Sequence, residues 1–336
     1  MIKRNEIFDM MKGVAILLMM YAHLVFGDTG TMQHIIYSFH MPLFFILAGI
    51  FAKELEAIPS FKQYSIKNAK RLLVPFYVTM LMRIGWGCVQ AYCKHNVSYI
   101  IQPTLSMLAA SPDSWHTQWG LVYAGPMWFL VSLFWVREIF YGIQYACKNV
   151  QKYQDELILG IAVALSIISV IVRPYLPSLP FGVLQAFTAV AFYAVGWYVH
   201  KHPVPWWVYA ISVVVWPLAI RYGQVALDCC CMTYYPLSFV GACGGTYLIY
   251  MLCKGLSLIR TYIKERIVSL PGSLIGWCGI YSLPILCMHE LEMYSDIYYS
   301  VICRIPVICE RAWGGVIAIL FAYIVINTPI LKDVYK

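Results

Sequence analysis

Charged side chains are scarce in this sequence. Asp, Glu, Lys and Arg make up 12% of the 336 residues, about half of their share in soluble domains. Hydrophobic residues make up 61%, and the mean hydropathy is +0.69. A surface with so few charges cannot stay hydrated, which excludes soluble, disordered and collagen-like chains. The composition predicts an all-α polytopic membrane protein.

About ten segments are apolar and long enough to form membrane-spanning helices, which need roughly 20 residues each. No small-residue cleavage site follows the first segment, so it is predicted to be a retained helix. No internal repeat or soluble domain is visible, and residues 1–336 are predicted to form a single membrane domain. The predicted spans are 12–27, 34–52, 72–92, 121–145, 157–173, 181–199, 206–222, 232–253, 273–290 and 312–330.

The distribution of basic residues predicts the orientation of these spans. With the N-terminus inside, most lysines and arginines fall in inside segments, as the positive-inside rule requires. Both termini are therefore predicted to be cytoplasmic. The net charge of +8 then belongs mostly to one membrane face, which argues against a nucleic-acid partner.

The twelve cysteines give little support for a metal site. The run Cys229–Cys231 lacks the CxxC spacing of a zinc site, and no metal is expected. Several cysteines fall in or near outside loops, where a disulfide could form. These are Cys93, Cys229, Cys230, Cys231, Cys303 and Cys309.

Ionisable residues at membrane depth are costly and are therefore candidates for function. Lys12 and His23 are eleven residues apart, which places them on nearly the same helix face with a rise of about 16 Å. Asp9 lies on almost the same stripe, one turn before Lys12. Such a helix could guide a charged molecule from the cytoplasmic edge toward an imidazole. Alternatively, Lys12 reaches the interface and His23 bonds a neighbouring helix.

Other ionisable residues fall in the remaining spans. His40 lies two residues before Pro42, which is expected to kink the second span. His289 lies near the outer end of the ninth span, and Arg83 lies near the middle of the third and needs a carboxylate, a cage of carbonyls or an anion. Arg137 and Glu138 are interpreted as interfacial residues.

A basic cluster precedes the third span. Lys67, Lys70 and Arg71 are expected in the second inside loop. The positive-inside rule explains most such clusters. Paired basic groups also bind phosphate well, so this loop is a candidate site for the phosphates of a cytosolic cofactor.

Five ordered segments resemble those of a known family, the acyltransferase-3 family of integral membrane O-acyltransferases. The first contains Asp9, Lys12-Gly13 and His23, and the second contains Phe39-His40-Met41-Pro42-Leu43-Phe44-Phe45. The others are Arg71-Leu72-Leu73-Val74-Pro75-Phe76, Trp128-Phe129-Leu130 and Ser282-Leu283 through His289. Many members carry a basic residue three positions before Arg71, where this chain has Asn68.

The resemblance implies transfer of an acyl group, usually acetyl, from cytoplasmic acyl-CoA to a hydroxyl of a glycan or glycolipid at the outer side. The closest similarity is to short members related to sugar O-acetyltransferases. His23 would be the catalytic histidine, acting as a general base or carrying the acyl group. Acetyl-CoA or another acyl-CoA would be the donor, and a bacterial cytoplasmic membrane the location. The candidate catalytic residues are His23, Asp9, His40 and His289, and the candidate donor-binding residues are Lys12, Lys67, Lys70, Arg71 and Arg83.

Two other functions fit the sequence. A transporter or flippase of an anionic or sugar substrate could line its path with Arg83, His23 and His289, although many transporters show a repeat. A membrane sensor or scaffold could use the buried polar groups only to hold helices together.

Overall fold

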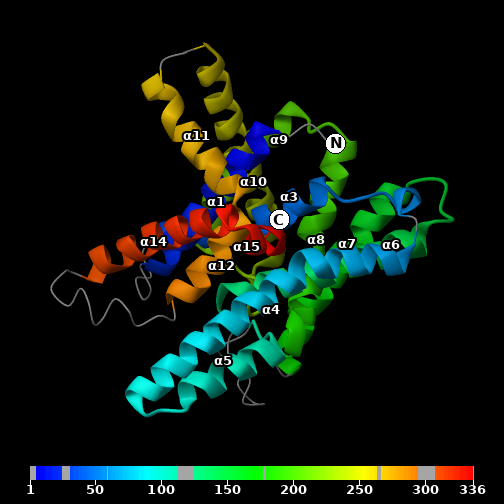
Figure 1. Cartoon of the computed structure of the whole chain (residues 1–336). Coiled ribbons are helices and arrows are strands. Elements are labelled where there is room, and N and C mark those ends of the chain that lie inside the picture. Colours follow the sequence, from blue (N-terminus) through cyan, green and yellow to red (C-terminus); the bar gives the residue numbers. More distant parts are fainter. Residues whose placement is uncertain are drawn as a thin grey trace.

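The computed structural model describes residues 5–24, 31–58, 60–112, 124–176, 179–262, 266–293 and 307–335. It is 84% helical, and the helices cross one another at varied angles (Figure 1). The longer helices are α1 (Glu6–Leu24), α3 (His40–Ile50), α4 (Phe61–Lys94), α5 (Ser98–Ala109), α6 (Trp128–Cys147), α7 (Gln154–Val172), α8 (Val183–Lys201), α9 (Trp206–Tyr222), α10 (Tyr235–Tyr262), α11 (Arg266–Ile280), α12 (Ser282–Met293) and α14 (Val307–Asn327).

Short elements connect these helices. The short helices are α2 (Thr31–Tyr37), α15 (Pro329–Val334) and the 3₁₀ turns η1 (Leu55–Ala57), η2 (Gly125–Met127), η3 (Arg173–Tyr175) and η4 (Pro180–Gly182). Strands β1 (Gln224–Ala226) and β2 (Cys231–Thr233) form an antiparallel hairpin between α9 and α10, in which Val225 faces Met232.

The predicted all-α membrane class is confirmed, but the number of spans is not. Five helical stretches in the described residues are long and apolar enough to cross a membrane, and α11 with α12 would add a sixth if the two form one bent span. Helices α9 and the described apolar part of α14 fall short of the length needed. Ten spans and cytoplasmic termini therefore remain predictions, and residues 25–27 and 121–123 of the predicted spans lie outside the described residues.

Two predicted spans are broken near their histidines. The second breaks at residues 38–39, between α2 and α3, and the ninth bends by 79° at Tyr281, between α11 and α12. Pro42 and Pro284 each stand three residues into the new helix. A proline ring clashes with the carbonyl four residues earlier, which is Ser38 in one case and Ile280 in the other. Each break therefore falls where a proline prevents the helix from continuing.

Helix α4 is longer than the predicted third span, because it begins at Phe61 rather than at residue 72. The Ser60 side chain caps its start by accepting a hydrogen bond from the Gln63 amide at 3.3 Å. Its 34 residues extend about 50 Å, well beyond a hydrocarbon core of about 30 Å. The prediction that Lys67, Lys70 and Arg71 lie in a loop is therefore wrong, because they lie on a helical extension.

Glycines allow the helices around the centre to pack closely. A β-carbon on Gly13 of α1 would collide with the backbone carbonyl of Ile275 in α11, and one on Gly279 would collide with the carbonyl of Asp9. Likewise, a β-carbon on Gly49 of α3 would collide with a backbone carbonyl of α8, and one on Gly196 of α8 would collide with a backbone carbonyl of α3. These contacts hold α1 and α3, which carry His23 and His40, at fixed positions.

Candidate functional site

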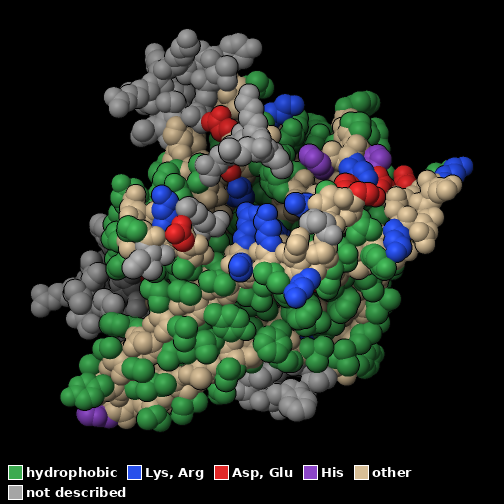
Figure 2. All heavy atoms as spheres, turned by 45° about the vertical axis from the view of Figure 1, so that its right-hand side comes forward, with side chains coloured by type: hydrophobic (Ala, Val, Ile, Leu, Met, Phe, Trp, Pro, Cys, Tyr) green, Lys and Arg blue, Asp and Glu red, His purple; other side chains and the backbone are tan. Residues whose placement is uncertain are grey.

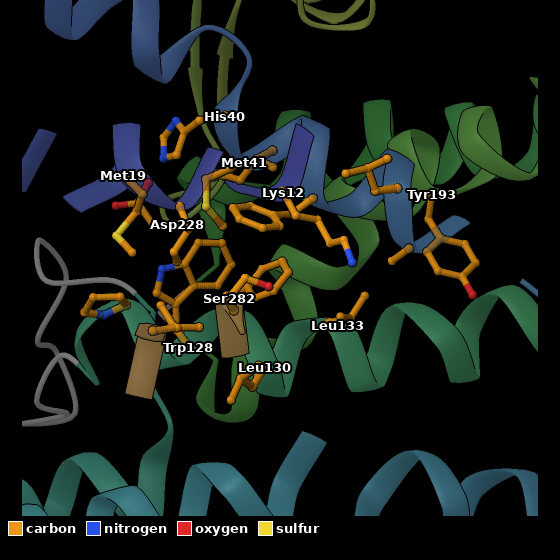
Figure 3. A pocket seen from close by; sticks show the side chains of 18 of the residues that line it. Lys12, Met19, His40, Met41, Trp128, Leu130, Leu133, Tyr193, Asp228 and Ser282 are labelled. Atoms are coloured by element: carbon orange, nitrogen blue, oxygen red, sulfur yellow. The ribbon is translucent and has the colours of Figure 1, made fainter. Parts of the chain in front are cut away.

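A large cavity lies among α1, α2, α3, α4, α6 and the β1–β2 hairpin. Its volume is about 1750 Å³, more than the 300–1,000 Å³ of typical small-molecule pockets. Figure 3 shows Lys12, His40, Trp128 and Asp228 among the side chains around it. Six of the nine candidate residues predicted from sequence line this cavity. They are Asp9, Lys12, His23, His40, Lys67 and Arg71.

Helix α1 carries its polar stripe along the cavity. Lys12 Nζ lies 2.7 Å from Asp9 Oδ1, so the two side chains form an ion pair one turn apart. His23 also lines the cavity, about 16 Å further along the helix. The predicted shared face of Asp9, Lys12 and His23 is therefore present in the structure. The Asp9 carboxylate restricts the Lys12 side chain and aligns it along this face.

The cavity has two chemically different ends because α1 and α3 run in opposite directions beside it. At one end, the rings of Phe8 and Phe51 meet with centroids 5.6 Å apart, next to the start of α1 and the end of α3. At the other end, His23 lies close enough to His40 for their charges to interact. A molecule that extends through the cavity would therefore pass from Lys12 to the histidines.

His23 and His289 face each other at the histidine end. Their ring centroids are 5.6 Å apart, and His289 Nδ1 lies 2.9 Å from Glu292 Oε2. Among the described residues, nothing hydrogen-bonds the buried Nδ1 of His23. Imidazole can accept or donate a proton near neutral pH, so His23 has a free nitrogen for that role. His289 is buried and is not one of the lining residues.

His40 has a defined orientation. Its Nδ1 lies 2.8 Å from the carbonyl oxygen of Ile36. A carbonyl can only accept, so Nδ1 carries a hydrogen and donates it, and in the neutral ring Nε2 is left as an acceptor. At the break before α3, this carbonyl also accepts a hydrogen bond from the Phe39 amide at 3.3 Å. His40 therefore brings a fixed hydrogen-bond acceptor to the cavity wall.

The opposite end of the cavity is cationic. Lys67 and Arg71, one turn apart on α4, line it together with Lys53. Figure 2 shows Lys and Arg side chains gathered around a hollow in this face of the molecule. Lys70 is exposed on the same helix but does not line the cavity. Three cationic side chains at one end of a cavity are suited to bind the phosphate groups of a ligand.

Arg83 is part of a buried ion pair. Its Nη1 donates to Oε1 of Glu290 at 2.7 Å, and the two side chains are 7% and 0% exposed. Gly125, at φ +61°, lets the backbone approach this carboxylate, because a β-carbon there would collide with it. The Glu290 carboxylate is therefore the partner that a charged Arg83 near mid-span is expected to need. Arg83 does not line the cavity.

Several lining residues have no site role in the sequence analysis, among them Arg137, Trp128 and Asp228. Arg137, which the sequence analysis interprets as interfacial, also lines the cavity beside Asn68. Trp128 belonged to a matched motif without an assigned role, and Asp228 in the hairpin turn had no sequence signal. Burial raises the pKa of the Asp228 carboxyl, and its carboxylate accepts hydrogen bonds from the backbone. Tertiary packing places Arg137 and Asp228 in the cavity, because each meets lining residues that are distant in the chain.

The described cysteines and acids do not form a metal site, since no group of three His, Cys, Asp or Glu side chains is positioned to hold an ion within the residues described. Cys93, Cys229, Cys230 and Cys231 are free thiols. Cys303 lies outside the described residues, and so does the side chain of Cys309.

Comparison with known families covers nearly the entire chain. Residues 5–327 match the sequence model of a family, acyltransferase-3, that is described as an acyltransferase domain. The chain belongs to this family. No curated protein and no solved structure matches the chain. Together with the apolar helices, the match identifies the protein as a membrane acyltransferase.

Proposed function

We propose that this acyltransferase moves an acyl group, most simply acetyl, from cytoplasmic acyl-CoA to a hydroxyl of a glycan or glycolipid on the opposite side of the membrane. The observation that carries the proposal is the single cavity that joins a cationic end to a histidine end. A donor with phosphates at one end and a thioester at the other matches this distribution of charge.

The dimensions of the cavity support an extended donor. The phosphates of acyl-CoA would bind Lys67 and Arg71, and the pantetheine arm would pass Lys12 toward His23. Lys12 and His23 are about 16 Å apart along α1, a distance that an extended arm can span. The positive-inside distribution of basic residues supports a cytoplasmic cationic end. The location in a bacterial cytoplasmic membrane is part of the proposal and follows from the family resemblance.

The acceptor would enter from the side of the β1–β2 hairpin. In Figure 3, Asp228 and Tyr193 lie toward opposite sides of the cavity with Lys12 between them. Asp228, Tyr37 and Gln33 line the hairpin side, where carboxylate, phenol and amide groups can hydrogen-bond hydroxyls. A hydroxyl held there would lie on the histidine side of the cavity.

The proposed chemistry is acyl transfer from sulfur to oxygen. The acceptor hydroxyl oxygen attacks the thioester carbonyl carbon, a C–O bond forms and the C–S bond breaks. His23 accepts the hydroxyl proton and returns it to the departing thiolate, which leaves as the CoA thiol. In a two-step route, the His23 imidazole would instead carry the acyl group between donor and acceptor. His40 and His289 would orient groups around His23, and Asp9 would hold Lys12 in place.

The test is acyl transfer by purified protein in detergent. Labelled acetyl-CoA is incubated with a panel of glycan and glycolipid acceptors, and ester product is measured by mass spectrometry. His23→Ala should lose at least about 100-fold in rate, since general acid–base groups contribute 10²–10⁴-fold. His200→Ala changes an exposed histidine at the end of α8 and should retain activity. Full activity in His23→Ala would overturn the mechanism, and movement of substrate without acyl-CoA would favour a transporter.

A further inference from the structure

Arg137 of α6 is held in the cavity wall by a buried amide. Its Nη1 donates to Asn68 Oδ1 at 3.2 Å, and Asn68 Nδ2 donates to Glu138 Oε1 at 3.0 Å. Asn68 is 5% exposed. A guanidinium can only donate and a carboxylate can only accept, so these two neighbours determine which way the amide points. Glu138 therefore orients Asn68, and Asn68 orients Arg137.

This arrangement leaves one edge of the guanidinium free. Within the described part of the chain, Nε of Arg137 is buried without a hydrogen-bond partner, and no carboxylate forms an ion pair with the side chain. Nε and Nη2 form the side edge of the guanidinium, where it can bind two oxygens of one anion. Asn68 occupies only Nη1, so the bidentate edge has no acceptor.

A second guanidinium lies nearby. Arg71 also lines the cavity, and the positive charges of Arg71 and Arg137 repel each other. Like charges held together at a partly buried site are costly unless an anion lies between them. Lys67, one turn before Arg71, adds a third cation to the lining. The nearby Glu138 carboxylate offsets only part of this positive charge, so an anion that carries more than one negative charge would stabilise the site.

We propose that Arg137 binds a phosphate group of the acyl donor together with Arg71, and that Asn68 and Glu138 are its positioning residues. This inference rests on the proposed function, because the anion is taken to be the nucleotide part of acyl-CoA. It adds a phosphate contact on α6, 66 positions beyond Arg71 of α4. Arg71 on α4 and Arg137 on α6 would then both bind the donor phosphates. These two contacts would determine how far the thioester extends toward His23.

The test compares the binding of CoA and of pantetheine, which lacks the phosphates, to purified full-length protein by titration calorimetry in detergent. Arg137→Gln should weaken CoA binding by about 10- to 100-fold, as expected for one or two charge-assisted hydrogen bonds. Pantetheine binding should stay within about twofold of wild type. Arg137→Lys should lie between, because an ammonium keeps the charge without the bidentate edge. Asn68→Ala should show a smaller loss, again confined to CoA.

The matched control is Arg221→Gln, which changes an exposed arginine at the end of α9 and should leave both affinities unchanged. Equal CoA binding by Arg137→Gln and wild type would overturn the Arg137 proposal alone. An equal loss for CoA and pantetheine would also overturn it, because it would indicate a general structural role. If wild-type protein binds pantetheine and CoA equally or binds neither, the donor assignment fails, and the Arg137 proposal fails with it.

Discussion

The buried pair of Arg83 and Glu290 makes a quantitative prediction about stability. Both side chains are almost completely buried, and their charged atoms are 2.7 Å apart. Removing one partner takes the ion pair away from the other buried charge, which typically costs about 3–5 kcal/mol. Arg83→Met and Glu290→Met should therefore each lower the free energy of unfolding by about that amount. This is a large part of the roughly 5–15 kcal/mol that stabilises a folded protein.

The double variant Arg83→Met/Glu290→Met should recover most of this loss. Replacing both members of a buried pair with apolar side chains is often neutral or stabilising, so the double variant should lie within about 1–2 kcal/mol of wild type. The sum of the two single losses in unfolding free energy would then exceed the loss of the double variant by several kcal/mol. The assay is a titration with SDS in mixed micelles, followed by the fluorescence of the 11 tryptophans.

A matched control is the more exposed pair Lys201 and Asp155, which is also 2.8 Å apart but has side-chain exposures of 32% and 18%. Lys201→Met should cost no more than about 1 kcal/mol. The reasoning would be refuted if the losses of Arg83→Met and Glu290→Met were small, or if they simply added in the double variant. CoA binding by the double variant decides whether Arg83 also contacts the donor. We expect retention, because Arg83 does not line the cavity.

Two further predictions concern packing and the hairpin. Gly279→Leu should separate α1 from α11 and lower the thermal midpoint of activity loss by several degrees, because any β-carbon there collides with the Asp9 carbonyl. The control Gly142→Ala should have little effect, because Gly142 has open space around it. Equal midpoints for the two variants would contradict the close packing of α1 and α11. Asp228→Asn should raise the KM for the acceptor by about tenfold, as expected for the loss of a hydrogen bond to a charged group, and leave CoA binding unchanged. Since burial raises the pKa of Asp228, the wild-type KM should rise as pH falls through a value above the usual 4, while the variant KM should not follow this change. A parallel pH profile in the two proteins would remove Asp228 from acceptor binding.

Much of the site could be predicted because its main elements are local in sequence. Asp9, Lys12 and His23 occupy one helix, so the helical period alone puts them on one face. Low charge and long apolar runs are sufficient to indicate membrane helices, since the bilayer imposes both. The motif residues on α3, α4 and α12 were also recognisable one by one. Family membership follows from these ordered segments, and the match over residues 5–327 confirms it.

Tertiary structure decided what hydropathy could not. The apolar run from 273 to 290 looks continuous in sequence, yet Pro284 bends it by 79° and turns Glu290 to Arg83. Helix α5 lies in a segment predicted to be a loop, and α4 extends far past its apolar part. Arg137 meets Asn68 across 69 residues, and Glu290 meets Arg83 across 207. The sequence by itself determined which residues are costly at membrane depth. Only helix packing decided whether each of them meets a buried partner or faces the cavity, because that outcome depends on neighbours distant in the chain.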